Sequence, residues 1–265
     1  MYGWAYRQYW RLNLLTLLEY RANFFMWAGF TIVYHGSAIV ALWVTLTQFP
    51  SMNGWDFRET AFMYGLWMLG NAVHSTFFFT IGSIPEFIRE GRFDRFLVRP
   101  LDPLFQAMTT PQMVSPDELI LAIVFFCIVT VTSGVRVDLI FVLFVPLVAI
   151  GGALIEFGIN LAIATAAFWF IRIDSLRWVV MSLEQDFSRY PISIYQRGVQ
   201  VMLAFVLPFA FMNYFPATYL LHKAEDGFHL NPAVGLLTPV VGVVWLAAAY
   251  AFWRVGINRY QGTGS

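Results

Sequence analysis

Charged residues are scarce in this chain. They make up 12% of its 265 residues, about half of the roughly 25% that soluble domains carry. Hydrophobic residues make up 59% and aromatic residues 18%, which leaves too few polar side chains to cover a surface that faces water. These proportions exclude an ordinary soluble domain and predict an all-α integral membrane protein.

Cysteine and net charge are also in short supply. The chain has one cysteine, Cys127, and a formal net charge of +0, so it can form no intrachain disulfide and has no electrostatic reason to bind nucleic acid. It has no G-x-x-x-x-G-K-[ST] loop for ATP, no H-E-x-x-H metal motif and no G-x-S-x-G nucleophile motif. We therefore expect no catalytic site, metal site or cofactor on this chain.

Long apolar runs are what the chain does have, and they predict six transmembrane helices in a single domain over residues 1–265. A helix needs about 20 apolar residues to cross a hydrocarbon core of about 30 Å. The predicted spans are 24–49, 60–83, 117–135, 138–171, 199–221 and 232–254. Pro146 and the pair Gly151–Gly152 interrupt the fourth run and predict a kink in it.

The placement of lysine and arginine predicts the orientation, because inner segments carry an excess of both. With the N-terminus inside, the outer segments hold only Arg58, Arg136 and Lys223 of the 16 basic residues. Both termini are then cytoplasmic, and the polar segment 172–198 lies on the inner side.

Two segments are expected to depart from regular spans. Residues 1–23 predict an interfacial helix with one apolar face, although a lead-in to the first span with snorkelling arginines fits the pattern equally well. Pro208, Asn213 and Pro216 interrupt the fifth apolar run. Because irregular backbone at membrane depth must be surrounded by protein or water, they favour a partly re-entrant segment on the outer side. A plain helix end followed by a loop is the alternative.

Four of the polar residues inside predicted spans form two pairs. Asn71 and His74 lie three apart on the second span, and Glu156 and Asn160 lie four apart on the fourth, so each pair occupies one helix face. An ionisable group at this depth costs about 2.5–3.5 kcal/mol on insertion scales and should face protein or water. They are candidates to line a substrate path, and helix–helix packing is the simpler alternative.

The predicted inner loop 84–116 carries the densest charge, in the stretch GRFDRFLVRPLDPL. Helical spacing places three apolar and three basic residues on separate faces: Phe93, Phe96, Leu97, and Arg92, Arg95, Arg99. A short helix with two such faces is suited to dock a soluble partner. An arginine cluster that sets topology and binds anionic lipid is the alternative.

Four stretches together resemble the permease subunits of bacterial ATP-binding cassette exporters of the ABC-2 class, in the six-span branch of about 260 residues. They are GRFDRFLVRPLDPLFQ in the inner loop, RYPISIYQRGVQ, VLPFAFMNYFPATYLL, and the ending WRVGINRYQGTGS. Their order and spacing agree with the family from the inner loop to the last residue. Residues before about position 80 carry little of this resemblance.

The resemblance implies a non-catalytic subunit in a bacterial inner membrane. Such permeases pair with a second copy or a related permease, and each pair binds two ATPase subunits that carry ATP and Mg. The inner loop of the family is its coupling element. The implied ATPase contacts in this sequence are Glu86, Arg89, Arg92, Asp94, Arg95 and Arg99.

The resulting prediction is an ATP-driven export permease that works by alternating access. Its aromatic composition suits an apolar or amphipathic cargo, and membrane lipids are expected around it. An ion-coupled secondary transporter that uses Glu156 and His74 is the alternative. That class is built from inverted repeats with paired broken helices, whereas only one broken span is visible here.

Overall fold

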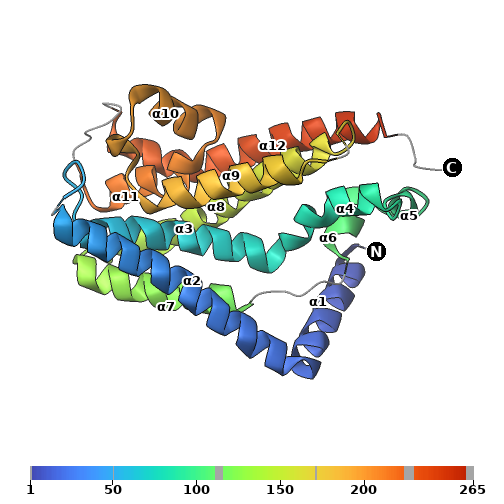
Figure 1. The fold of residues 1–265 in the computed structure, drawn as a ribbon, viewed down its shortest axis with the longest axis horizontal. Helices are drawn as coiled ribbons and strands as arrows, with labels where there is room; N and C mark the ends of the chain where they lie inside the picture. The colour runs from blue at the N-terminus through green and yellow to red at the C-terminus, as the bar shows by residue number, and fades with distance from the viewer. Residues whose placement is uncertain (1, 50, 111–115, 171, 224–229, 261–265) are drawn as a thin grey trace.

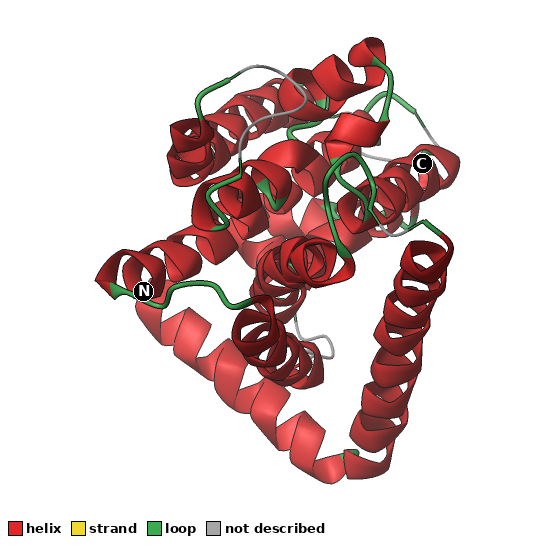
Figure 2. Cartoon of the chain, turned by 90° about the vertical axis from the view of Figure 1, so that its left-hand side faces the viewer, coloured by secondary structure: helices red, strands yellow, loops and turns green. Residues whose placement is uncertain are grey.

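The computed structural model describes residues 2–49, 51–110, 116–170, 172–223 and 230–260. Within these ranges the regular structure is helical, as Figure 2 shows. Residues 111–115 of the predicted inner loop and the last five residues of the fourth family stretch lie outside the described residues.

The helices follow one another in this order: α1 Tyr2–Glu19, α2 Arg21–Gln48, α3 Phe57–Phe77, η1 Phe79–Ser83, α4 Ile84–Arg89, α5 Asp94–Leu97, α6 Pro103–Met108, α7 Pro116–Ser133, α8 Leu139–Ala166, α9 Asp174–Arg189, η2 Ile192–Ile194, α10 Arg197–Val201, η3 Met202–Val206, η4 Phe209–Phe211, α11 Tyr214–Leu220, η5 Pro232–Leu237 and α12 Thr238–Ile257.

The long helices form an elongated bundle with α3 and α8 at its centre (Figure 1). Helix α3 packs against α7 and α8, and α12 packs along α8. Helices α4, α5 and α6 gather at one end of the bundle, and α10 and α11 lie at the other (Figure 1). Helix α1 forms a V with α2, and its first residue, Tyr2, contacts Phe105 on α6.

Four of the described helices are long and apolar enough to cross a membrane: α2, α7, α8, and η5 continued by α12. The segment 197–220 adds a fifth only if its two halves, bent by 74°, are counted together. The two predicted spans that are not among these four are 199–221, which is the bent segment, and 60–83, where α3 carries polar side chains that it buries against neighbouring helices. On α3, Thr60 and His74 are both buried.

Glycines bring the central helices close together. A Cβ on Gly70 of α3 would lie 3.4 Å from the Cα of Gly152 on α8, and one on Gly242 of α12 would lie 2.6 Å from the carbonyl oxygen of Gly151. Small residues that allow such backbone approach are the usual packing device of membrane helices. Helix α8 continues through Pro146 and Gly151–Gly152 as one helix and uses these glycines as contact points, so the kink expected there stays a prediction.

Helix α9 corrects the expected placement of segment 172–198. At its start, Arg177 donates to the carbonyl of Gly82 just after α3, and beyond its end the carbonyl of Ser193 accepts from Asn53 just before α3. The segment therefore runs the length of α3 and does not stay at the end that holds α4–α6. Polar contacts with α3 allow a helix without a long apolar run to do this.

The predicted span 199–221 is also corrected. The chain enters this segment from Ser193, beside Asn53, and leaves it at Lys223, which bonds to the carbonyl of Gly54. Both flanks therefore lie at the same end of the bundle, and the segment turns back at Leu207–Pro208, between its two bent halves. The segment therefore forms a hairpin that begins and ends at one end of the bundle.

Candidate functional site

The end that carries α4, α5 and α6 is built around one buried aromatic side chain. Phe93 is fully buried, and its ring lies 5.5 Å from Phe168, 5.9 Å from Trp253 and 5.2 Å from Tyr260. Gly91 precedes it with φ 68°, a left-handed conformation that glycine adopts without steric cost. The turn at Gly91 therefore fixes the short helices to the ends of α8 and α12.

A second set of contacts holds the stretch between α5 and α6. The side chain of Gln106 is 6% exposed, and its Nε2 donates to the carbonyls of Phe96 at 2.8 Å and Leu101 at 2.7 Å. Asp102 caps α6 by accepting from the amide of Phe105. These bonds fix the stretch from Phe96 to Phe105, which includes Arg99, against α6.

Four of the six predicted ATPase contacts have partners within the chain. Arg92 lies 2.5 Å from a carboxylate oxygen of Glu90 and 3.7 Å from one of Glu86, and its guanidinium lies 4.8 Å above the centre of the Phe87 ring. Arg89 pairs with Asp174 of α9 at 3.3 Å. Asp94 accepts a hydrogen bond of 2.7 Å from the hydroxyl of Tyr260.

Arg95 and Arg99 differ from these four. Both are exposed, and neither has an ion pair or side-chain hydrogen bond within the described part of the chain. Together with Arg92 they line a hollow of about 270 Å³ between α5 and α6. Its other lining residues are Phe87, Phe96, Leu101, Gln106, Thr109 and Thr110, none of them acidic.

The polar residues predicted inside the spans meet at the contact of α3 with α8. Asn71 donates to Glu156 Oε1 at 2.9 Å, and the Nδ1 atom of His74 lies 2.9 Å from the same oxygen. Asn160 bonds back to the carbonyl of Glu156 within α8 at 3.0 Å. His74, Glu156 and Asn160 are each less than 9% exposed, so the two predicted faces do turn toward each other.

Sequence reasoning missed a further buried carboxylate. Glu184 of α9 is 5% exposed and accepts from the indole N–H of Trp67 on α3 at 3.1 Å. The sequence predicted an inner, polar segment at 172–198, in which a carboxylate needs no buried hydrogen-bond donor. The available signal was periodicity, since Glu184 and Ser188 lie one helical turn apart and both are buried.

The residues predicted to break the fifth run lie in the hairpin between α10 and α11. Pro208 follows η3 at the bend, and Pro216 lies in the first turns of α11. Asn213 is 2% exposed, donates to the carbonyl of Ser188 at 2.8 Å, and accepts from the amide of Tyr214. It therefore ties the returning arm of the hairpin to the end of α9.

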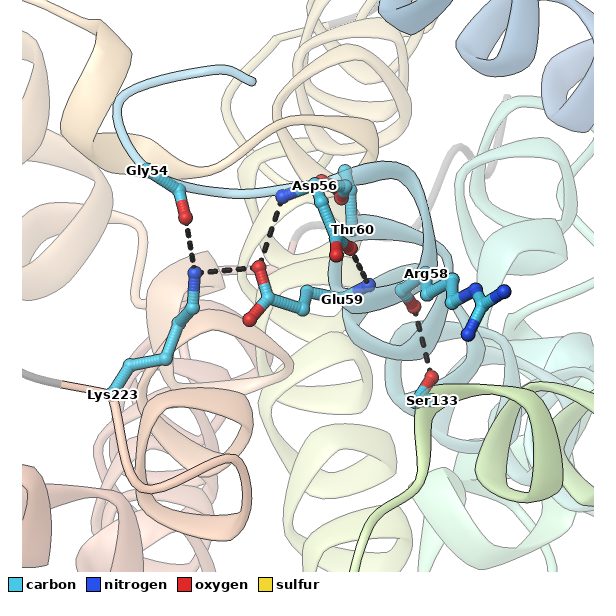
Figure 3. A network of polar contacts seen from close by, with 7 residues as sticks. All are labelled: Gly54, Asp56, Arg58, Glu59, Thr60, Ser133 and Lys223. Atoms are coloured by element: carbon cyan, nitrogen blue, oxygen red, sulfur yellow. Dashed lines mark hydrogen bonds and ion pairs between the residues drawn. The ribbon is translucent and has the colours of Figure 1, made fainter. Parts of the chain in front are cut away.

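A polar network closes the end of the bundle opposite α4–α6 (Figure 3). Asp56 and Glu59 form a capping box at the start of α3, each accepting from the other's backbone amide. The ammonium of Lys223 lies 2.6 Å from Glu59 and also bonds to the carbonyl of Gly54. The contact fixes the exit of the hairpin to the beginning of α3.

A metal centre has no counterpart in this arrangement. Within the described ranges no group of three or more His, Cys, Asp or Glu side chains is placed to hold a metal ion.

Comparison with known proteins gives one family. A family model described as ABC-2 family transporter protein matches residues 32–264. No curated protein and no solved structure gives a significant match.

Proposed function

Because the chain belongs to the ABC-2 transporter family, we propose that it is the permease subunit of an ATP-driven exporter. Membership of this family implies association with an ABC ATPase. The sequence has no phosphate-binding loop of its own, so ATP and Mg would be bound by the partner, two copies per transporter. This chain would act without catalysis, by converting the partner's movement into a change in its own helices.

The observation that carries the proposal is the connection of α4–α6 to the long helices. Phe93 packs directly against Trp253 of α12 and against Phe168 just beyond α8, and Arg89 links α4 to the start of α9. A force applied to the arginine-bearing end therefore reaches three helices through side-chain contacts. This end is the coupling element of the proposed transporter.

The proposed topology has six crossings, α2, α3, α7, α8, α9 and α12, with both termini and α4–α6 on the cytoplasmic side of a bacterial inner membrane. Helix α9 is exposed on its apolar side, at Leu176, Trp178, Val179 and Met181, and buries Glu184. The middle of α9 therefore suits contact with lipid, while the exposed carboxylates Asp174 and Asp186 lie toward its two ends. The hairpin 197–220 then enters from the outer side and returns to it.

The cargo is proposed to be apolar or amphipathic, moved by alternating access between two permeases. Exposed apolar side chains on α2, among them Phe25, Phe30 and Val33, are available for lipid or for the second permease. The cluster of Asn71, His74, Glu156 and Asn160 is proposed to face the path when the helices separate. Helix α1, which lies across the end of the bundle, is proposed to rest at the inner membrane surface.

The test is co-expression and reconstitution of this chain with the ABC ATPases of its source organism. The two should co-purify, and ATP hydrolysis by the ATPase should depend on the permease. If the chain alone supports gradient-driven flux without ATP, it is an ion-coupled transporter and the proposal fails. Absence of any complex with an ABC ATPase would also overturn it.

A further inference from the structure

We propose that the hollow between α5 and α6 binds an acidic side chain of the partner ATPase, and that Arg95 and Arg99 supply its specificity. This inference rests on the proposed function and narrows it. The resemblance to the family implies that six charged residues of this end contact the ATPase, without distinguishing among them. The structure divides them into residues that hold the end together and two that are free to bind.

The division follows from charge pairing. Arg92 is neutralised by Glu86 and Glu90 and held over Phe87, so its guanidinium is committed to the fold. Arg89 and Asp94 are committed to Asp174 and Tyr260. Among the charged residues of segment 84–108, Arg95 and Arg99 are therefore the two arginines with no carboxylate partner in the described part of the chain. Residues 103–116 add no acidic side chain either.

The hollow also presents an acceptor. Gln106 lines it and donates from Nε2 to the carbonyls of Phe96 and Leu101, while its Oε1 is buried without a partner. A complete occupant would place an anion near the two arginines and an N–H group near this oxygen. Phe87 and Phe96 form an apolar wall beside it.

An acidic residue of a protein partner meets all of these requirements. Its carboxylate accepts from guanidinium N–H groups in the paired geometry that arginine favours, and a nearby amide of the same segment can donate to Gln106. The phosphodiester of a lipid supplies the anion alone, and the hydroxyl or ammonium donors of its headgroup are not held in place beside it as a backbone amide is. A hollow of about 270 Å³ accommodates one such side chain and its flanking backbone. We therefore assign the hollow to the ATPase and not to the bilayer.

The experiment measures binding of the ATPase to the full-length permease in nanodiscs of phosphatidylcholine. Arg95→Gln and Arg99→Gln should each weaken the affinity by about tenfold or more, because a desolvated charge pair loses one partner. The wild-type affinity should fall more steeply with salt than that of the double variant. Arg58→Gln is the matched control, since Arg58 is an exposed arginine at the opposite end of the bundle.

Three results would overturn the inference. If wild type binds the ATPase and both variants bind it equally well, the hollow is not the contact and the proposed function stands. If the variants lose binding only in nanodiscs that contain phosphatidylglycerol, an anionic lipid occupies the hollow. If wild type binds no ABC ATPase at all, the proposed function fails and this inference fails with it. Thermal unfolding of each variant shows that a loss of affinity does not reflect misfolding.

Discussion

His74 and Glu156 face each other across the contact of α3 with α8, with the imidazole Nδ1 2.9 Å from a carboxylate oxygen. Asn71 donates to that same oxygen, so one atom of α8 receives two contacts from α3. The other carboxylate oxygen and the imidazole Nε2 are buried without a partner. Glu156 is thus held by one side of its carboxylate only.

A double-mutant cycle should detect this contact. Combining Asn71→Ala with Glu156→Ala should give a coupling free energy of about 0.6 kcal/mol, and at most about 1.7 kcal/mol, the range for hydrogen bonds between membrane helices. Unfolding in detergent measures it. Asn71→Ala combined with Thr45→Val on α2 should instead be additive. A coupling no larger than in this control would contradict the contact, and unchanged transport by Glu156→Gln would limit Glu156 to packing.

Substitution of Gly242 should separate α8 from α12. A Cβ there would lie 2.6 Å from the carbonyl oxygen of Gly151, and the backbone cannot rotate away as a side chain can. Gly242→Ala should therefore lower the free energy of unfolding by about 1–3 kcal/mol, as overpacking does. Gly36→Ala on α2 meets nothing within 4 Å and should stabilise the protein by about 0.5–1 kcal/mol. Effects of equal sign at both positions would refute the close approach.

Cysteine labelling should place Gln196 on the same side as Ser51. Both residues are exposed at the end of the bundle that holds Asn53, whereas Val98 on the coupling end is 84% exposed. In a Cys127→Ser background, a membrane-impermeant maleimide should react in intact cells with Gln196→Cys and Ser51→Cys. Val98→Cys should react only after permeabilisation. Labelling of Gln196→Cys together with Val98→Cys would rule out the re-entrant hairpin.

Lys223→Met should lower the free energy of unfolding by breaking the polar network of Figure 3, at the end of the bundle opposite α4–α6. It removes the bonds to Glu59 and Gly54 and the contact with Trp55, whose ring centre lies 4.5 Å from the ammonium. A partly buried charged hydrogen bond is worth about 1.5–3 kcal/mol, and thermal unfolding should show a loss of that order. Arg136→Met, an exposed residue of the same end, should stay within about 0.5 kcal/mol of wild type. Similar losses in both would show that only net charge matters.

Hydropathy located the apolar helices because each of them corresponds to one continuous apolar run in the sequence. Helices α2, α7, α8 and α12 coincide with runs long enough to cross a bilayer, and the prolines of the hairpin marked the irregular segment. Hydropathy did not identify α9 as a long buried helix, because its sequence mixes polar and apolar residues. The polar groups of Glu184 and Arg177 bond to Trp67 and to the carbonyl of Gly82, and not to water. Whether Glu184 has Trp67 as a partner depends on a residue far away in the sequence, and no periodicity reveals that.

The coupling end shows the same limit at shorter range. Helical spacing separated the arginines from Phe93 and Phe96, yet α5 covers only Asp94–Leu97. The turn at Gly91 brings Arg92 back to Glu86 and Glu90, a pairing that no i, i+4 rule contains. Spacing therefore found the charged cluster but could not say which of its arginines were already neutralised.

The path of α9 has a consequence for how the protein is made. In the proposed topology its far end delivers Arg197 to the outer face, against the rule that arginines remain inside. Neither hydropathy nor local charge would direct this helix across the bilayer during synthesis. Its insertion should depend on α3 being already in place, because Glu184 and Arg177 of α9 bond to Trp67 and to the carbonyl of Gly82. The fifth crossing would then be an event of folding and not of translocation.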